Sequence, residues 1–277
     1  MLYPPKHRSV IHMDLDTFFV SVECLRDNRL KGKPLIIGGS GDRGVVAACS
    51  YESRHFGIYS GMPMRLARQL CPDAIIISGD MDAYSKYSRS ITEIIAETSP
   101  VFEKSSIDEF YIDVTGMDRF FGCYKWGSWL RKRIIHESGL PISMGLSINK
   151  LVSKVATGES KPNGQRHILE GQEKIFLDPL PIRKIPMVGE KTGQFLMEMG
   201  IKTVHTLRLM PIEMLQAAFG KNGTELWKRA NGIDHSPVVP HSEQKSISTE
   251  MTFESDTIDV KMMKSVITAM VEKIAFQ

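Results

Sequence analysis

The sequence predicts an α+β protein, and three features of its pattern lead to that class. Short apolar runs of strand length, such as residues 35–37 and 74–77, alternate with segments in which apolar residues recur every three or four positions. Two strand-like runs at 101–104 and 109–114 are separated by a tight polar bend and predict a hairpin. Apart from the segment between the first helix and residue 84, the order is strand, helix, then helix, two strands, helix, strand, helix. This order indicates a small antiparallel or mixed sheet backed by helices.

Each element follows from its own pattern. In the first helix, Phe18, Val22 and Leu25 fall at helical spacing, and in the second strand of the hairpin apolar and polar residues alternate. The expected strands are 9–14, 35–37, 45–48, 74–77, 101–104, 109–114 and 141–148. The expected helices are 18–25, 64–70, 84–97, 126–137 and 151–159, and the polar and aromatic stretch that runs to residue 63 is assigned no element.

The character of the sequence changes after about residue 171. Short helices separated by prolines are expected as far as residue 232, followed by a polar linker. The last part predicts one strand at 246–253 and one helix at 260–275. Because a lone strand and helix do not close a core, we expect the chain to end part-way through a domain.

Composition sets broad limits on function. The formal net charge of +3 is compatible with a nucleic-acid partner without requiring one. The four cysteines are widely spaced, so they predict free thiols in a reducing compartment and no zinc site. Apolar runs are too short to cross a bilayer, and the first residues lack the apolar core of a signal peptide. We therefore expect a cytoplasmic protein.

The first candidate site is Asp14, at the end of an apolar strand and before a helix. A carboxylate in that place suits a divalent cation that bridges to phosphate, and free amides of the first helical turn can donate to phosphate oxygens. The pattern Asp14-Leu15-Asp16-Thr17 is also how phosphoaspartyl hydrolases present a nucleophile. We interpret Asp14 as the ligand and Asp16 as a helix cap.

The second candidate site is the adjacent pair Asp108 and Glu109, at the bend of the hairpin. Neighbouring carboxylates repel each other and lose solvation among apolar flanks unless a cation offsets them. A solvated acidic turn is the alternative. Together with Asp14, this pair has the composition of a ligand set for two Mg²⁺ ions in phosphoryl transfer. Lys154, near the start of a later helix, is either a triphosphate ligand or a surface lysine.

These segments together resemble the Y-family (translesion) DNA polymerases, with the bacterial polymerase IV branch nearest. The resemblance rests on the Met13–Glu23 segment, on Ser50–Pro63, on Ser106–Asp113, and on Gly145–Lys150 followed by Lys-Pro-Asn-Gly at 161–164. Their order and spacing hold from about residue 8 to 240. The resemblance implies a right-hand polymerase fold with a palm, small fingers, a helical thumb and an incomplete little finger.

Roles for individual residues follow from the resemblance. It implies that Asp14, Asp108, Glu109 and the main-chain carbonyl of Leu15 bind two Mg²⁺ ions, for which Mn²⁺ is the expected substitute. The incoming nucleotide would be held by Phe18, Phe19, Tyr51, Arg54 and Lys154. Phe19 would lie beneath the sugar as a steric gate against ribonucleotides. Ala48 departs from the family, because many relatives have a threonine there that contacts phosphate.

A second departure lies in the expected thumb. Residues 185–192 resemble a helix-hairpin-helix that grips DNA through main-chain amides, and the implied DNA-binding residues are Val188, Gly189, Lys191 and Thr192. Met187 replaces the glycine that relatives use for a tight hairpin. An ordinary helical turn is the alternative for this segment.

The resemblance also implies a division of the chain and an activity. The palm is expected at 8–18 and 81–168, the fingers at 19–80, the thumb at 169–233, the linker at 234–243 and the start of the little finger at 244–277. We expect a template-directed, error-tolerant polymerase that extends a primer 3′-hydroxyl in translesion synthesis and repair. Primer-template DNA, dNTP and a sliding clamp are the expected partners of a monomer. The alternatives are a catalytically weak DNA-binding scaffold and a phosphoaspartyl hydrolase.

Overall fold

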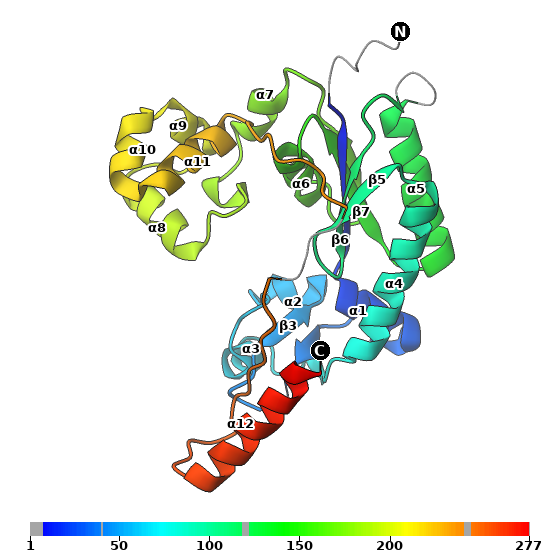
Figure 1. Ribbon diagram of the computed structural model, residues 1–277, viewed down its shortest axis with the longest axis vertical. Coiled ribbons are helices and arrows are strands. Elements are labelled where there is room, and N and C mark those ends of the chain that lie inside the picture. The colour runs from blue at the N-terminus through cyan, green and yellow to red at the C-terminus, as the bar shows by residue number, and fades with distance from the viewer. Residues whose placement is uncertain (1–7, 40, 118–121, 241–244, 277) are drawn as a thin grey trace. The chain divides into compact units, whose positions relative to one another are not determined.

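A computed structural model describes residues 8–39, 41–117, 122–240 and 245–276. The chain forms two compact units. The first consists of Met1–Asp16 with Ser85–Pro240, and the second of Thr17–Tyr84 with His241–Gln277. Each unit has its own sheet, so each is described by itself (Figure 1). Within the described residues, no helix is both long enough and apolar enough to cross a membrane.

The first unit is built on a five-stranded mixed sheet. Its strand order is β5-β6-β1-β7-β8. The strands are β1 (Val10–Leu15), β5 (Val101–Lys104), β6 (Glu109–Asp113), β7 (Ile142–Ser147) and β8 (Gln165–His167). All neighbours are antiparallel except β7 and β8, which are parallel. The central strand β1 is therefore covered on both edges and carries the apolar run that sequence analysis predicted.

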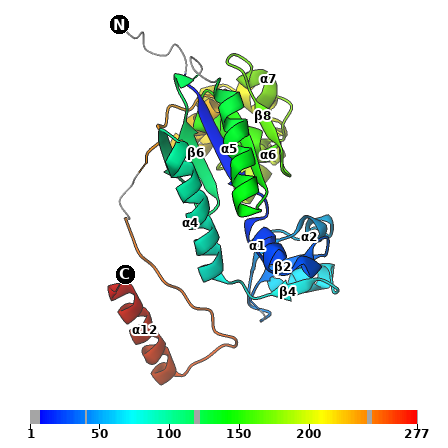
Figure 2. The same ribbon diagram turned by 90° about the vertical axis from the view of Figure 1, so that its right-hand side faces the viewer.

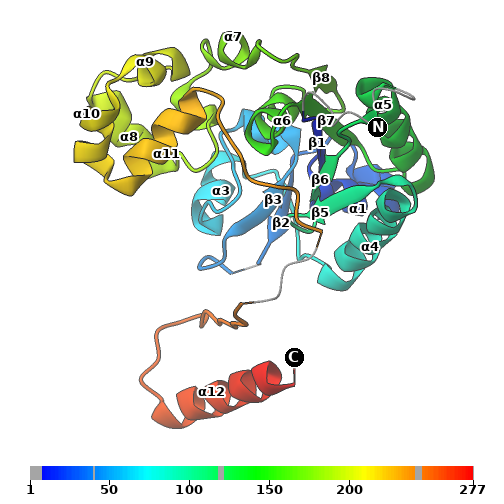
Figure 3. The same ribbon diagram turned by 45° about the horizontal axis from the view of Figure 1, so that its top comes forward.

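Helices cover both faces of this sheet. On one side lie α4 (Met81–Thr98) and α5 (Cys123–Ser138), and on the other lies α6 (Lys150–Gly158) (Figure 3). Helix α5 packs closely at Gly127, where a Cβ atom would lie only 2.6 Å from Ile11 Cδ1. Because β1 side chains alternate between faces, Ile11 points toward α5 while His12, bonded to Thr157 of α6, points the other way. Asp14 shares the α6 face with His12.

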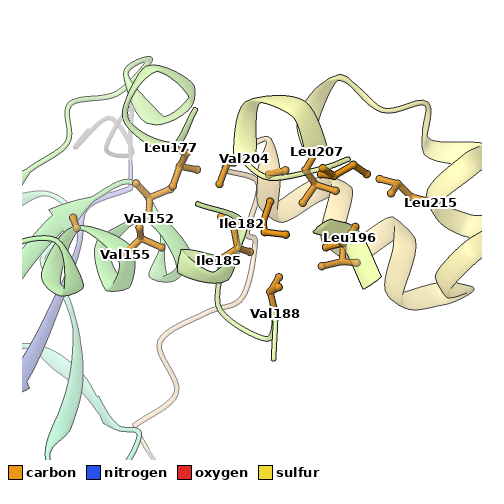
Figure 4. Close-up of a cluster of buried hydrophobic side chains, with 14 of the residues drawn as sticks. Val152, Val155, Leu177, Ile182, Ile185, Val188, Leu196, Val204, Leu207 and Leu215 are labelled. Atoms are coloured by element: carbon orange, nitrogen blue, oxygen red, sulfur yellow. The ribbon is translucent and has the colours of Figure 1, made fainter. Parts of the chain in front are cut away.

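A set of short helices follows β8 in the same unit. They are α7 (Glu173–Leu177), the 3₁₀ turn Ile182–Lys184, α8 (Glu190–Glu198), α9 (Val204–Leu209), α10 (Ile212–Phe219) and α11 (Lys221–Ala230). Their apolar side chains form one buried cluster with Val152 and Val155 of α6 (Figure 4). Burying each Leu, Ile or Val contributes roughly 1.5–3 kcal/mol, so this shared core joins the helical segment to the sheet.

The second unit has a three-stranded sheet of order β3-β2-β4. Its strands are β2 (Leu35–Gly38), β3 (Val46–Cys49) and β4 (Ile75–Ile77). Its helical elements are α1 (Phe18–Arg26), the 3₁₀ turn Asn28–Leu30, α2 (Tyr51–His55) and α3 (Met64–Leu70) (Figure 2). The core of this sheet is formed by Ile36, Val46, Cys49, Ile58, Met62, Met64, Ala67 and Cys71. Helix α12 (Val260–Ala275) has no buried residue.

The α+β class is confirmed, and most predicted elements lie within a few residues of their expected bounds. The strand expected at 246–253 is wrong, because the structure gives this segment no regular secondary structure. A strand needs a neighbour for its backbone hydrogen bonds, and no described segment pairs with this one. Sequence analysis also missed α2 and β8, which are five and three residues long. The predicted boundary residues 241–244 lie outside the described residues.

Candidate active site

The register of the central sheet brings the predicted carboxylates together. In the antiparallel pair of β1 and β6, Asp14 lies directly opposite Glu109. The next residue of β1, Leu15, donates its backbone N–H to the carbonyl of Asp108 at 3.1 Å. Opposed residues of an antiparallel pair have neighbouring side chains on one face. The three carboxylate residues are therefore held at adjoining strand ends by main-chain bonds.

The bend before β6 is fixed by serine hydroxyls. Ser106 donates its hydroxyl to Asp108 Oδ1 at 2.6 Å, and the backbone N–H of Glu109 donates to Ser106 Oγ at 3.1 Å. From α4, Ser88 donates to the carbonyl of Ile107 at 2.5 Å. Short side chains that bond to nearby backbone stabilise turns of this kind. The bend thus holds Asp108 and Glu109 in one arrangement.

Electrostatics at this site disfavours negative charge on Asp14. Burial raises the pKa of Asp14 to about 7, Lys161 opposes that increase, and the neighbouring charges of Glu109 and Asp108 add to it. The side chain is 15% exposed and forms an ion pair with Lys161. A group of hard oxygen ligands whose mutual repulsion is relieved by a cation is the donor chemistry that Mg²⁺ prefers.

The predicted residue Lys154 lies at this site. Its Nζ donates to both carboxylate oxygens of Glu109, at 2.7 and 2.6 Å. The start of α6 is fixed by Asn149, whose side chain accepts from the N–H of Val152 at 2.9 Å and caps the helix. Lys154, one turn further along, therefore projects from a well-defined helix toward the carboxylates.

Two lysines occupy the positions closest to the carboxylates. Lys161 pairs with Asp14 and Lys154 pairs with Glu109. Among the described residues, no group of three or more His, Cys, Asp and Glu side chains is gathered into a metal-binding arrangement. The donor residues are thus close in the sheet, and two of them, Asp14 and Glu109, form ion pairs with lysines.

The prediction that Asp16 caps the first helix is wrong. Thr17 stands at the N-cap position of α1, with a left-handed φ of 43° and no side-chain capping bond. The Asp16 carboxylate is buried instead, and the Ser143 hydroxyl lies 2.9 Å from each of its two oxygens, which accept from it. It also accepts from the backbone N–H of Asn163 at 2.6 Å. These partners belong to β7 and to the turn after α6.

Sequence analysis missed Lys161 as a site residue. It belongs to the Lys-Pro-Asn-Gly turn at 161–164, a motif whose pattern alone gives its lysine no role. The available signal was that motif's position, directly after the helix that carries Lys154. The direction of the lysine depends on a turn conformation that the sequence pattern does not specify.

The second unit contains residues that the sequence predicts to bind the sugar and the phosphates of the nucleotide. Phe18 is 3% exposed and belongs to the core, whereas Phe19 is half-buried and stacks on Tyr84. Tyr51 opens α2, and the guanidinium of Arg54 lies 5.0 Å from the centre of its ring. The two rings of the first helix therefore have different surroundings, as the spacing of Phe18 with Val22 predicts.

The thumb-like hairpin has the geometry of a tight turn. Met187 has a left-handed φ of 72°, and Gly189 is the N-cap of α8 without a side-chain capping bond. Val188 is buried, while Lys191 is exposed and Thr192 is half-buried. The first amides of α8 are thus left to solvent or to a ligand. Met187 thus adopts a backbone conformation that glycine adopts more readily, at the position where relatives have a glycine.

Comparison with known proteins decides the family. The family model described as impB/mucB/samB matches residues 13–158, and a model described as the thumb domain of DNA polymerase iota matches residues 183–234. DNA polymerase IV of Dehalococcoides mccartyi (strain CBDB1) is 44% identical over 269 residues, which is 96% of this chain and 69% of that protein. The chain belongs to the Y-family DNA polymerases. The segment that carries the three carboxylates lies wholly inside the family match.

Further relatives agree with this assignment. DNA polymerase IV of Xanthomonas campestris pv. campestris (strain 8004) is 42% identical over 90% of this chain and 70% of its own length. Among solved structures, a Y-family DNA polymerase chimera has a TM-score of 0.85 at 29% identity, covering 97% of this chain and 80% of that one. DinB from Sulfolobus solfataricus has a TM-score of 0.77 at 31% identity, covering 84% and 69%. The fold of this Y-family chain therefore agrees with that of its solved relatives.

Proposed function

We propose that this protein is a template-directed, error-tolerant DNA polymerase that adds deoxynucleotides to a primer 3′-hydroxyl during translesion synthesis and repair. The observation that carries the proposal is the pairing of Asp14 with Glu109 across β1 and β6, beside Asp108. Membership of the Y family establishes a DNA-directed DNA polymerase. The reaction steps and the roles of single residues are our proposal.

The donor set fits two divalent cations, with Mg²⁺ as the natural ion and Mn²⁺ as a substitute. Asp14, Asp108, Glu109 and the main-chain carbonyl of Leu15 would hold them. The fit rests on oxygen-only donors and on the raised pKa of Asp14, since burial and two neighbouring carboxylates disfavour its charge. When bound, the ions would acidify the primer hydroxyl and offset charge on the phosphates.

The lysines of the first unit would bind the triphosphate. Lys154 and Lys161 stand beside Glu109 and Asp14, so each presents an ammonium where polyphosphate charge would arrive. An ammonium that now balances a carboxylate would donate to phosphate oxygens instead once cations take the carboxylates. In the second unit, the hydroxyl of Tyr51, the guanidinium of Arg54 and the backbone amides of Phe18 and Phe19 would donate to triphosphate oxygens.

Sugar selection would depend on Phe19. Its ring is half-buried and is supported from behind by the ring of Tyr84. A supported ring cannot move aside for an additional 2′-hydroxyl without strain in the packed surroundings. Phe19 would therefore exclude ribonucleotides sterically, as a gate beneath the deoxyribose.

DNA would be gripped by the hairpin before α8. Val188, Gly189, Lys191 and Thr192 surround the uncapped N-terminus of that helix, where amides suit backbone phosphate. One solved relative is described as an insertion ternary complex of Dbh DNA polymerase, with a TM-score of 0.73 at 30% identity. We propose primer-template DNA and dNTP as partners, together with a sliding clamp, and a monomer that acts in the cytoplasm.

The test is extension of a labelled primer on a short template, with a single dNTP and Mg²⁺. Template-directed addition of the complementary nucleotide is expected. DNA binding without any addition would indicate a scaffold, and release of phosphate from small phosphoesters without DNA would indicate a hydrolase. Either result would overturn the proposal.

A further inference from the structure

Asp16 is a buried carboxylate with no part in the roles assigned above. Only 1% of the residue is exposed, although an ionised carboxylate loses several kcal/mol of solvation when it is buried without partners. Ser143 Oγ donates to both of its oxygens, and the N–H of Asn163 donates to Oδ2. Hydrogen bonds of this number and length offset the burial, so Asp16 is a satisfied anchor for its partners.

Asn163, whose N–H donates to Asp16, belongs to the Lys161–Gly164 turn. A second charged side chain also bonds to this turn. Arg131 of α5 is also buried, and its Nη2 donates to both the carbonyl and the side-chain oxygen of Asn163. Gly164 is required beside it, because a Cβ atom there would lie 2.0 Å from the carbonyl oxygen of Ser160. The turn is thus fixed by a carboxylate on one side and a guanidinium on the other.

Lys161 opens this turn and reaches the site from it. Its ammonium forms an ion pair with Asp14, and it lies 3.9 Å from Asp16 Oδ1. A lysine side chain is long and has several rotatable bonds, so its direction depends on where its backbone is held. Asp16 holds that backbone two residues away, at Asn163.

We propose that Asp16 is a positioning residue that directs Lys161 toward the triphosphate beside Asp14. The inference rests on the proposed polymerase function and deepens it. Asp16 does not contact the nucleotide in this scheme. It acts through Lys161, by holding the turn at Asn163 and by the ion pair with the Lys161 ammonium at 3.9 Å. Its loss should therefore weaken nucleotide binding to the extent that Lys161 contributes to it, and no further.

Asp16→Asn is the suitable change because it keeps the volume of the side chain. It removes the negative charge and leaves one acceptor oxygen in place of two, so the bonds with Ser143 and with the N–H of Asn163 lose their charge assistance. Ser143→Ala is the second variant, since it retains the carboxylate and removes its other donor; it also removes the acceptor of the Gly164 N–H, in the same turn. Circular dichroism at several temperatures would show that each variant is folded.

The experiment measures the dissociation constant of the complementary dNTP on a dideoxy-terminated primer-template, which binds nucleotide without reacting. Wild type, Asp16→Asn, Lys161→Met and the double variant form a cycle. Asp16→Asn and Lys161→Met should each weaken binding about tenfold, the effect expected for loss of one charge-assisted hydrogen bond. The double variant should bind the dNTP like Lys161→Met alone. Ser143→Ala should weaken dNTP binding by a smaller factor, and it should have no effect in a protein that already carries Lys161→Met.

A matched control is Asp113→Asn, a carboxylate of the same sheet at the other end of β6 from Glu109, which accepts from Thr115 N–H. Asp113→Asn should leave nucleotide binding unchanged, both in the wild-type protein and in Lys161→Met. If Asp16→Asn weakens binding by the same factor with and without Lys161, its role is structural and the inference is wrong. Unchanged nucleotide binding by Lys161→Met would also overturn the inference. In that case, primer extension by the wild-type protein would leave the polymerase assignment intact. A wild type that extends no primer would instead contradict the proposed function.

Discussion

The ring of Phe19 lies nearly parallel to the ring of Tyr84, with centroids 4.3 Å apart and an interplanar angle of 12°. Tyr84 is fully buried, and its hydroxyl donates to Glu23 Oε1 at 2.8 Å. Burial and this bond to Glu23 raise the pKa of Tyr84 to about 12, so the donor proton is retained at neutral pH. The half-buried ring of Phe19 therefore rests on a support that is itself fixed at its far end.

The first prediction concerns sugar selection. Phe19→Ala should open space for a 2′-hydroxyl while leaving the carboxylates and lysines of the first unit unchanged. Ribonucleotide insertion should rise by orders of magnitude relative to deoxynucleotide insertion, which should fall only modestly, because the exclusion is steric. The measurement is kcat/KM for dCTP and CTP opposite a template G.

Phe18→Ala is the control for this prediction. Phe18 is 3% exposed, so its truncation should cost about 3–5 kcal/mol of stability with little effect on the sugar ratio. A ratio that stays constant in Phe19→Ala, or changes more in Phe18→Ala, would show that the wrong aromatic ring has been placed beneath the sugar.

The second prediction concerns the carboxylate pair. Asp108→Ala and Glu109→Ala should each reduce nucleotide addition by several decades, because several kcal/mol of transition-state stabilisation depend on the cations they hold. Fold and DNA affinity should be nearly retained, since both side chains are partly exposed at the bend. Single-turnover primer extension with Mg²⁺ gives the rate, and fluorescence anisotropy gives DNA affinity. Extension at the wild-type rate by either variant would be incompatible with the two-cation assignment.

Sequence reasoning located these carboxylates because they depend on local pattern. An apolar strand that ends in Asp14, and a hairpin with Asp108 and Glu109 at its bend, specify the strands and the place of each carboxylate at a strand end. The antiparallel register of β1 and β6 then brings Asp14 opposite Glu109. Long, strongly patterned elements such as α4 and β7 were predictable for the same reason.

What sequence reasoning missed depends on contacts between distant segments. An aspartate before a helix is equally suited to cap it or to accept bonds from elsewhere. The partner that decides, Ser143, is 127 residues from Asp16 along the chain. The direction of Lys161 depends in turn on Asn163, which has a positive φ of 50° and is held by Arg131. No local pattern specifies either relationship.

The third prediction concerns pH and the helical segment. Hydrogen bonds from Arg208, opposed by burial and aided by a bond from His205, lower the pKa of Asp178 to about 2. A carboxylate whose folded pKa lies below its unfolded value of about 4 stabilises the protein above pH 4. That contribution is lost as the pH falls from about 4 to about 2. After allowance for solvent screening at this partly exposed pair, we expect about 1 kcal/mol.

Urea unfolding of wild type and Asp178→Asn at pH 6 and pH 3 tests this prediction. The variant should be less stable than wild type at pH 6, and the difference should shrink at pH 3. Arg208→Met removes the other partner of the same ion pair, whose Nη2 lies 2.7 Å from Asp178 Oδ2, and should also be more destabilising at pH 6 than at pH 3. An Asp178→Asn difference that is equal at both pH values would contradict the assignment.

The last prediction concerns Met187, whose backbone has a left-handed φ of 72° although its side chain is 78% exposed. A non-glycine residue costs about 1–2 kcal/mol in that region, whereas an exposed side chain contributes little packing that could be lost. Met187→Gly should therefore stabilise the protein by roughly 0.5–1 kcal/mol, after the entropy of glycine in the unfolded chain is counted. The hairpin amides near Gly189 should keep their positions, so the slope of DNA affinity against salt, about −0.9 per phosphate contact, should stay constant.

Thermal unfolding and salt titrations of both proteins give these quantities. Met187→Ala is the matched control, because it shortens the side chain without relieving the backbone. A loss of stability in Met187→Gly, or an equal gain in Met187→Ala, would show that backbone strain at this hairpin is not what the glycine removes.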